Sequence, residues 1–235
     1  MKAMILAAGF GERMRPLTEH TPKPLLRVAN TPLMEHHLRR LAALGVVDIV
    51  INVAHLGEQI EHYFGDGRAF GVNITYSREV QPLETAGGIQ QALPLLAGAP
   101  FMVINGDVWT DYPFERLCEY TLAPWEQAHL VMVDNPEHHP LGDFCLDEAG
   151  RVSKRVGSRP GHTYAGVALF NPAFFAGLAP GRLALRPLLD AAIAAGALGG
   201  EYYPGEWVDV GTPERLAELD TLVTARVRSA QEQVE

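Results

Sequence analysis

Residues 2–14 read Lys2-Ala3-Met4-Ile5-Leu6-Ala7-Ala8-Gly9-Phe10-Gly11-Glu12-Arg13-Met14, and this segment is the strongest indication of the fold class. A short apolar run passes directly into a loop with two glycines, as a buried parallel strand does where it ends at a turn. Gly9 and Gly11 carry no Cβ, so the backbone around them can approach an anion closely. Glycines also serve strand-to-helix turns for geometry alone, so the pair by itself is a weak signal. The segment predicts a strand over 2–7 followed by a candidate phosphate loop.

Short apolar runs alternate with longer amphipathic segments through the first half of the chain. This alternation is typical of parallel strands joined by crossover helices. We predict strands near 2–7, 47–53, 72–76, 100–105 and 128–133, and helices over 32–44, 60–64, 86–96 and 114–122. Parallel sheets bind ligands at the carboxyl ends of their strands, so the loops after the first and fourth strands are expected to meet there.

The sequence changes character from Leu141 onward, where short segments are separated by turns rich in Gly and Pro. We predict that residues 143–146, 151–156 and 163–170 are antiparallel strands of a small lobe. A helix over 183–195, a strand over 207–210 and a closing helix over 212–227 follow, the last capped by Thr212 with Pro213 at its first position. One domain is therefore expected over 1–227, with halves at 1–135 and 136–227, and a frayed polar tail over 228–235.

The composition describes one enzyme-sized α/β domain that binds anions locally. The chain has 235 residues, of which 47% are hydrophobic and 20% charged. Its net charge of −9 argues against general binding to nucleic acid or to an anionic membrane. A bound phosphate must therefore be held by a local cluster, and residues 1–30 carry five basic side chains against two acidic ones.

Targeting signals and disulfides are not expected. The apolar run over 3–8 is too short for a secretory signal, and no later run reaches the roughly 20 apolar residues of a membrane span. Cys118 and Cys145 are the only cysteines, too few for a disulfide framework and without the spacing of a zinc or redox motif. The chain is therefore expected to work in a reducing cytoplasm.

The glycine loop does not match two familiar phosphate loops. The dinucleotide-binding pattern requires a third glycine where this chain has Met14, and an acidic residue about 20 positions later. The P-loop requires Gly-Lys-Ser/Thr, which the chain lacks. The loop becomes specific through its continuation, Arg13-Met14-Arg15-Pro16-Leu17-Thr18 and then Thr21-Pro22-Lys23-Pro24-Leu25-Leu26.

The whole string resembles the phosphate-binding and catalytic loop of the sugar-1-phosphate nucleotidyltransferase family, Leu-Ala-Ala-Gly-x-Gly-x-Arg followed by Pro-Leu-Thr and Pro-Lys-Pro. The resemblance implies a Rossmann-like α/β fold with a mixed, mainly parallel sheet, flanking helices and a small antiparallel sugar-binding lobe. It implies Arg13 and Lys23 as the catalytic cations. Lys23 stands between two prolines on a stiffened loop, and Arg13 is a fork-shaped donor that is always charged. Nucleotide contacts are implied for Ala8, Gly9, Gly11, Glu12, Arg13 and Lys23.

Two aspartates stand beside apolar strands that are far apart in the sequence. Asp107 ends Phe101-Met102-Val103-Ile104-Asn105-Gly106-Asp107, and Asp209 lies in Trp207-Val208-Asp209-Val210-Gly211-Thr212. A strand-ending aspartate is more often a turn former or a helix cap. The resemblance assigns both aspartates to Mg²⁺, which is usually held by one or two carboxylates with water and phosphate. It assigns Asn105 and Trp207 to the sugar phosphate.

Residues 79–88 resemble the segment of the family that contacts the nucleobase. The resemblance makes Gln81, Ala86 and Gly87 the contacting residues. Gln81 offers both a donor and an acceptor to a base edge, and a glycine lets the backbone lie close to the base. The simpler interpretation, a strand-to-helix turn with glycines near the start of the helix, is compatible with this one.

The second half of the chain carries a weaker match. Gly142 resembles a sugar-contacting glycine, and Lys154 stands twelve residues before Gly166, as the lysine of the family does. The resemblance therefore assigns Lys154 and Gly166 to the sugar phosphate. The neighbours of Lys154 are Ser153 and Arg155, whereas the family has Glu-Lys-Pro, so a surface lysine remains the alternative.

None of the nine histidines belongs to a matched motif. The implied chemistry needs no histidine base, because the attacking group is a phosphate monoester whose second pKa is near 6 and which is mostly dianionic at neutral pH. Whole-chain likeness to short members of cell-wall recycling implies UTP and N-acetylmuramate 1-phosphate as substrates and Mg²⁺ as cofactor. A mannose- or glucose-1-phosphate enzyme is the alternative within the class, and a homo-oligomer stays open.

A member of a different class is the second alternative, a non-catalytic regulatory subunit that only binds a sugar nucleotide. Such subunits tend to lose the loop arginine, the lysine or a metal-binding aspartate. Arg13, Lys23, Asp107 and Asp209 are all present, which favours an enzyme.

Overall fold

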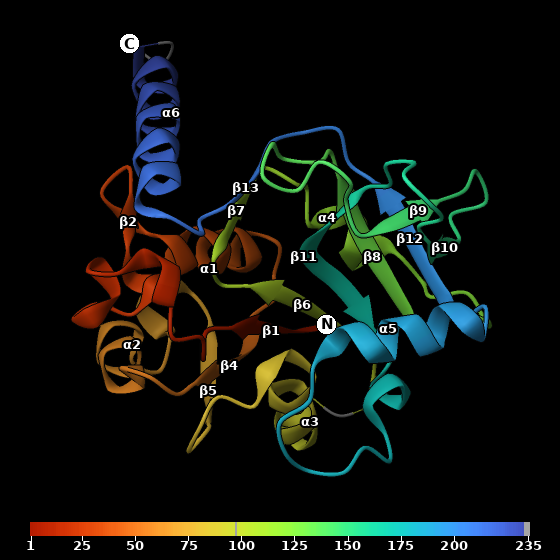
Figure 1. The fold of residues 1–235 in the computed structure, drawn as a ribbon. Helices are drawn as coiled ribbons and strands as arrows, with labels where there is room; N and C mark the ends of the chain where they lie inside the picture. Colours follow the sequence, from red (N-terminus) through yellow and green to blue (C-terminus); the bar gives the residue numbers. More distant parts are fainter. Residues whose placement is uncertain (97, 233–235) are drawn as a thin grey trace.

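The computed structural model describes residues 1–96 and 98–232. A seven-stranded sheet with the strand order β12-β8-β11-β6-β1-β4-β5 forms the centre, and helices cover both of its faces (Figure 1). The strands of this sheet are β1 (Lys2–Leu6), β4 (Asp48–Val53), β5 (Asn73–Arg78), β6 (Phe101–Asn105), β8 (Ala128–Val133), β11 (Thr163–Phe170) and β12 (Leu198–Tyr202). The helices are α1 (Leu33–Ala43), α2 (Gly57–Phe64), α3 (Glu84–Leu96), α4 (Glu115–Glu119), α5 (Leu185–Ala194) and α6 (Pro213–Glu232).

Short two-stranded sheets complete the fold. They pair β2 (Arg27–Val28) with β3 (Thr31–Pro32), β7 (Val108–Thr110) with β13 (Trp207–Asp209), and β9 (Phe144–Leu146) with β10 (Val152–Lys154). In the described ranges, no helix is both long enough and apolar enough to span a membrane.

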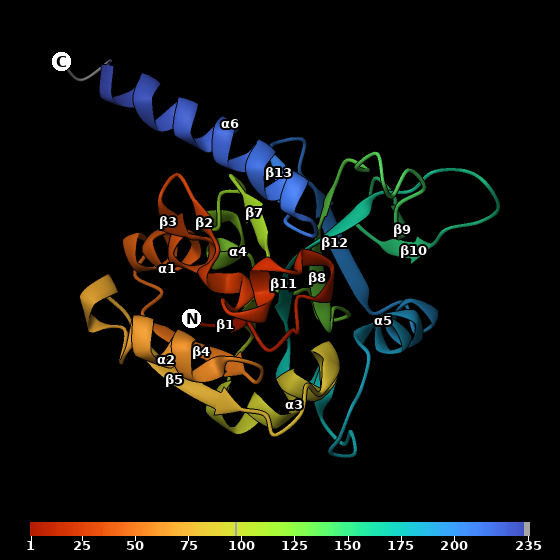
Figure 2. The same cartoon turned by 60° about the vertical axis from the view of Figure 1, so that its left-hand side comes forward.

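The first strand is apolar throughout because it is covered on both faces. Successive side chains of a strand point to opposite faces. Ala3 and Ile5 join one buried cluster with Leu38 of α1, whereas Met4 joins the other with Ile89 of α3. The helices α1 and α2 therefore lie on one side of the sheet, and α3 and α5 lie on the other (Figure 2).

The sheet is mainly parallel, which confirms the predicted fold class. β1 is parallel to β4 and β6, β4 is parallel to β5, and β12 is parallel to β8. The strands predicted at 2–7, 47–53, 100–105 and 128–133 match β1, β4, β6 and β8 to within one residue at each end. β5 extends to Arg78, beyond the predicted end at 76.

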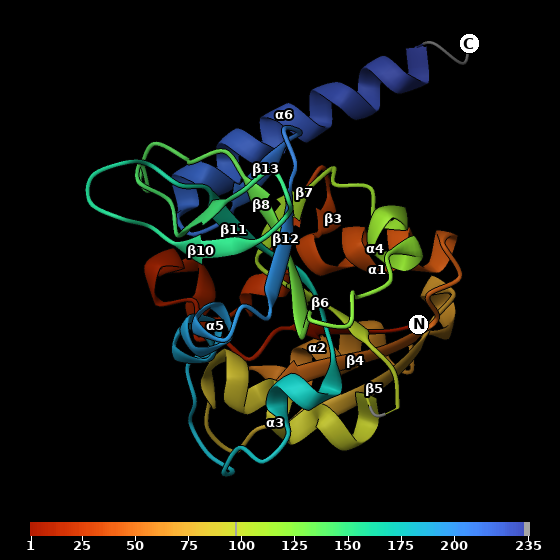
Figure 3. The ribbon, with the colours of Figure 1, turned by 90° about the vertical axis from the view of Figure 1, so that its right-hand side faces the viewer.

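The strand predicted at 163–170 has the correct bounds and is antiparallel to its neighbours, but its assignment to the small lobe is wrong. β11 runs antiparallel between β6 and β8 in the central sheet. Residues 165–170 are all buried, so this strand requires cover on both faces, which a small lobe could not provide. The separate antiparallel pair is β9 with β10, which packs on β12 and α5 (Figure 3).

Several elements differ from the prediction. β12 was not predicted, because its Gly199 and Gly200 give no strand signal. Both glycines are required by close packing, since a Cβ would lie 1.6 Å from Glu126 Oε1 at the first position and 2.8 Å from Leu130 O at the second. The prediction of a frayed tail over 228–235 is wrong for 228–232, because these residues belong to α6. Residues 233–235 lie outside the described ranges.

The closing helix α6 begins as predicted. Thr212 Oγ1 accepts a hydrogen bond from Arg215 N at 3.4 Å, and Pro213 occupies the first helical position. Leu219 and Val223 pack with Met14 of the glycine loop segment and with Trp109 of β7. The first part of α6 therefore packs against both the glycine loop segment and β7. The rest of the helix extends away from the body of the protein (Figure 2).

His37 of α1 is buried beside the strand that leads to the candidate site. Its Nε2 lies 2.8 Å from the carbonyl oxygen of Val108, and burial lowers its pKa from 6.5 to about 4. The folded protein therefore keeps this imidazole neutral over a pH range in which the unfolded chain binds a proton.

We predict that His37 makes the protein less stable as the pH falls through 6.5 towards 4. Because its pKa is depressed in the folded state, the unfolded state gains about 2 kcal/mol at pH 5 relative to pH 7. Urea unfolding at the two pH values should show a loss of stability that is about 2 kcal/mol smaller in His37→Gln than in the wild type. The exposed His62→Gln is the matched control. Equal losses in all three proteins would contradict the assignment.

Candidate active site

The glycine loop after β1 forms one wall of a cavity of about 570 Å³. Gly11 has φ +65°, and a Cβ there would lie 2.8 Å from Thr18 Cγ2, so the turn requires glycine. Thr18 Oγ1 donates a hydrogen bond to Gly11 O at 2.7 Å and closes the turn. Nothing lies within 4 Å of a Cβ built on Gly9, so packing does not explain that glycine. The space beside Gly9 leaves its backbone open to the cavity, as the predicted phosphate loop requires.

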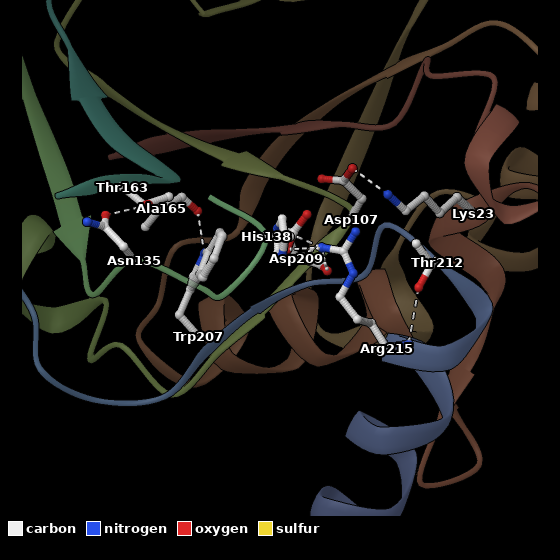
Figure 4. A network of polar contacts seen from close by, with 10 residues as sticks. All are labelled: Lys23, Asp107, Asn135, His138, Thr163, Ala165, Trp207, Asp209, Thr212 and Arg215. Carbon is white, nitrogen blue, oxygen red and sulfur yellow. Dashed lines mark hydrogen bonds and ion pairs between the residues drawn. The ribbon is translucent and has the colours of Figure 1, made fainter. Parts of the chain in front are cut away.

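Lys23 and Asp107 meet at this cavity. Lys23 Nζ donates to Asp107 Oδ2 at 2.6 Å, and Lys23 is only 8% exposed (Figure 4). Gly106 N donates to Leu6 O at 2.9 Å, and a Cβ on Gly106 would lie 2.7 Å from the same oxygen. The end of β6 therefore crosses over the end of β1, which directs Asp107 towards the glycine loop.

Asp209 is brought beside Asp107 by the pairing of β13 with β7. Val208 and Asp209 are in register with Trp109 and Val108, and Val210 N donates to Asp107 O at 2.9 Å. The two residues predicted to bind the metal are thus brought to the lining of one cavity, although they come from distant parts of the sequence.

The two carboxylates are too few to bind a metal ion through protein ligands alone. They suit Mg²⁺, which also takes ligands from water and phosphate. Among the described residues there is no group of three or more His, Cys, Asp or Glu side chains that could hold a metal ion. Two carboxylates that line one cavity provide hard oxygen ligands and leave the other coordination positions to phosphate and water, as Mg²⁺ prefers. The residues present therefore fit the metal that the sequence implies.

A second cavity of about 350 Å³ adjoins the first. Arg13, Asn105 and Asp107 line both cavities. Gly166 has φ +70°, and a Cβ there would lie 2.5 Å from Asn105 Nδ2. A glycine at this position therefore leaves the space that the side-chain amide of Asn105 occupies. Trp207 Nε1 donates to Ala165 O at 2.8 Å (Figure 4). The second cavity is also lined by Val108, Pro136, His138, His139, Asp143, Thr163, Tyr164, Ala165, Gly166, Trp207 and Asp209.

The structure thus gathers most of the predicted site residues. The first cavity is lined by Ala8, Gly9, Gly11, Glu12, Arg13 and Lys23. The second cavity is lined by Asn105, Asp107, Gly166, Trp207 and Asp209.

Other predicted residues do not line either cavity. Gln81 is exposed and does not line the first cavity, although its neighbour Pro82 does. Ala86 and Gly87 are buried in α3, where Gly87 N donates to Leu183 O at 3.1 Å. A Cβ on Gly87 would lie 2.2 Å from Gly181 O, so this glycine is required for helix packing.

Two predicted sugar-phosphate residues also stand apart from the cavities. Gly142 has φ +66°, and a Cβ there would lie 2.4 Å from Asn135 Oδ1, so it serves a tight turn. Lys154 is exposed, with its Nζ 3.7 Å from Asp190 Oδ2. Its position fits the surface-lysine alternative.

The sequence analysis missed a buried polar pair that shapes the first cavity. Asn52 Oδ1 accepts from Ala7 N at 2.9 Å, and Asn52 Nδ2 donates to Glu79 Oε1 at 2.7 Å. Glu79 Oε2 accepts from Leu83 N at 2.8 Å, which ties the segment before α3 to the glycine loop. The available signal was a polar residue near the end of an apolar strand, Ile49-Val50-Ile51-Asn52-Val53.

The second cavity carries a further carboxylate that was not predicted. Asp143 Oδ2 accepts from Tyr164 N at 2.9 Å, and its Oδ1 lies 3.2 Å from His139 Nε2. Burial, with a smaller contribution from Asp143, raises the pKa of the Tyr164 hydroxyl, so the phenol stays neutral and can donate a hydrogen bond. The cavity therefore offers both donors and acceptors to a hydroxylated ligand.

The fold and the site together have the features of a protein that binds phosphorylated ligands. A glycine loop, two cations and two carboxylates line adjoining cavities beside the carboxyl ends of β1 and β6, where parallel sheets bind nucleotides.

The sequence profile of the nucleotidyl transferase family matches residues 2–226, and the chain belongs to this family. The N-acetylmuramate alpha-1-phosphate uridylyltransferase of Neisseria meningitidis serogroup B is 51% identical over 229 residues, which cover 96% of this chain and 99% of that protein. The mannose-1-phosphate guanyltransferase of Hypocrea jecorina is 35% identical over 231 residues, which cover 91% of this chain and 62% of that protein. The resemblance seen in the glycine loop is thereby confirmed, and the chain is a nucleotidyltransferase.

A solved structure confirms the fold independently. HddC from Yersinia pseudotuberculosis, complexed with GMP-PN, superposes with a TM-score of 0.79 at 20% sequence identity. The match covers 94% of this chain and 99% of that one.

We predict that Gly166→Ala lowers kcat/KM by about tenfold to a hundredfold, because the new Cβ displaces the Asn105 amide. The readout is pyrophosphate release from a nucleoside triphosphate and a sugar 1-phosphate. Gly177→Ala is the matched control, since Gly177 has a similar φ of +77° but open space around its Cβ position. Both variants should lose about 1 kcal/mol of stability from the strained backbone. Equal kcat/KM values in the two variants would show that the position of Asn105 does not matter for the reaction.

Proposed function

We propose that this enzyme transfers a uridylyl group from UTP to N-acetylmuramate 1-phosphate, forming UDP-N-acetylmuramate and pyrophosphate. One structural observation carries the proposal: two adjoining cavities share Arg13, Asn105 and Asp107, so two phosphorylated substrates can meet at one point. The choice of substrates is supported by 51% identity over almost the whole length of a relative with that activity in its name.

In this proposal the triphosphate occupies the larger cavity and the sugar phosphate the smaller one. An oxygen of the sugar phosphate attacks the α-phosphorus, a new P–O bond forms, and the bond to the bridging oxygen breaks with its electrons leaving on pyrophosphate. A phosphate monoester with a second pKa near 6 is already dianionic at pH 7, so no protein base is needed. Position and charge neutralisation then provide most of the rate acceleration.

Arg13 and Lys23 are the proposed catalytic cations. Both line the larger cavity, and Arg13 also lines the smaller one, so it can contact the transferred phosphate and the sugar phosphate. Lys23 is held against Asp107 by a 2.6 Å contact, near the boundary between the cavities. These cations would stabilise the charge that develops on the leaving pyrophosphate.

Asp107 and Asp209 are the proposed ligands of Mg²⁺. When bound there, the ion supplies positive charge to the phosphate oxygens. The carboxylates orient it, and the backbone hydrogen bond from Val210 N to Asp107 O fixes the separation of their two strands.

A mannose- or glucose-1-phosphate enzyme remains the second candidate, supported by 35% identity to the mannose-1-phosphate guanyltransferase. A single panel tests both. Pyrophosphate release with Mg²⁺ is measured for four nucleoside triphosphates, each combined with muramyl, glucosaminyl, mannosyl and glucosyl 1-phosphates. We expect UTP with N-acetylmuramate 1-phosphate to give the highest kcat/KM. A higher value for GTP with mannose 1-phosphate would overturn the proposal in favour of the second candidate.

We predict that Lys23→Ala lowers kcat by about a thousandfold, because the transition state loses a buried cation. The expected loss of stability is small, since the remaining Asp107 side chain is 42% exposed and water can solvate it. Thermal unfolding of the same preparation checks the fold. Lys2→Ala is the control, since Lys2 lines neither cavity and donates to Leu95 O. A Lys23→Ala enzyme with normal turnover would refute the role.

A further inference from the structure

Arg215 contacts the proposed metal ligand Asp209. Its guanidinium forms an ion pair with Asp209 Oδ1, and its Nη1 donates to Asp209 O at 3.2 Å (Figure 4). The same Nη1 lies 2.9 Å from His138 Nε2, which is itself 3.1 Å from Asp209 Oδ1. The Arg215 side chain is 18% exposed, so the cation is largely enclosed with its carboxylate.

The helix itself does not explain an arginine at this position. Arg215 lies in the first turn of α6, where the positive end of the helix dipole disfavours a cation. Gly211 shows that the chain makes room for it, because a Cβ there would lie 2.5 Å from Arg215 Nη2 and 3.2 Å from Asp209 Oδ2. The Asp209 carboxylate is therefore the interaction that holds Arg215 in place.

Both proposed metal ligands carry an internal cation. Lys23 pairs with Asp107, and Arg215 pairs with Asp209, so the two carboxylates are neutralised before any ligand arrives. A divalent ion at the same oxygens would face two adjacent positive charges. Metal binding at these oxygens would therefore displace the cations, and the phosphates of the substrates are anions that can accept them.

We propose that Arg215 is a positioning residue that competes with the divalent cation for Asp209, so that metal binds tightly only when an anionic ligand accepts the guanidinium. This inference rests on the proposed metal site of the previous subsection. It predicts weak metal binding to the free enzyme and positive coupling between metal and phosphate ligand. If Arg215 instead only supported Asp209, its removal would weaken metal binding.

The test uses Mn²⁺ as the probe and electron paramagnetic resonance of the free ion as the readout, without substrates. We expect Arg215→Gln to bind Mn²⁺ about tenfold more tightly than the wild type, because the competing charge is gone. After correction for the Mn²⁺–pyrophosphate complex measured without protein, pyrophosphate should tighten Mn²⁺ binding to the wild type more than to the variant, so that the two affinities converge. Unchanged or weaker Mn²⁺ binding by Arg215→Gln would overturn the proposal.

Control variants separate this inference from the metal site itself. Arg215→Lys retains a cation and should stay near the wild type, and Arg226→Gln removes an arginine of the same helix that pairs with Glu206. Asp209→Asn should abolish the tight Mn²⁺ binding that the wild type shows in the presence of pyrophosphate. If it does not, the proposed metal site fails; if it does while Arg215→Gln has no effect, only the competition fails. Circular dichroism of each variant verifies the fold.

Discussion

The parallel ladder between β1 and β6 is the constraint on which the site depends. It aligns Leu6 with Asn105, so both strands end at the same edge of the sheet. The hydrogen bond from Gly106 N to Leu6 O then carries the chain over the end of β1. Only a residue without a Cβ fits there, because a Cβ would lie 2.7 Å from that oxygen. An anion-binding loop and a carboxylate thus face one cavity as a direct result of strand pairing, without a special arrangement of side chains.

A second ladder adds the distant part of the chain to this centre. β13 pairs with β7, directly after Asp107, and sets Asp209 beside it. The helix that follows packs Leu219 and Val223 against Met14 and Trp109. The same apolar cluster therefore packs against the glycine loop segment and fixes the position of the segment that carries Asp209. Burial of these apolar side chains stabilises the fold through the hydrophobic effect. This stabilisation offsets the cost of placing Asp107 and Asp209 at one site, where the two like charges would repel each other if left unpaired.

The sequence predicted those features that depend on local pattern. The glycine loop, the stiff Pro-Lys-Pro segment and the two aspartates are read from neighbouring residues, and all of them reach the cavities. Strand 163–170 was found with correct bounds, yet its place between β6 and β8 depends on chain direction, which apolar runs do not reveal. The strand at 198–202 was missed because glycines imposed by close packing hide it. Arg215 left no signal at all, since its partner becomes a neighbour only after folding.

The charge pairing explains how an acidic protein can accept two phosphorylated substrates. The chain carries a net charge of −9, so unpaired carboxylates at the cavity would repel phosphate. Asp107 is paired with Lys23 and Asp209 with Arg215, which cancels most of that repulsion before any ligand arrives. Both carboxylates are partly exposed, at 42% for the Asp107 side chain and 23% for the Asp209 side chain, so phosphates and a divalent ion can reach both ion pairs. In the proposed mechanism each cation exchanges its carboxylate for a phosphate, which leaves the carboxylate free for the divalent ion.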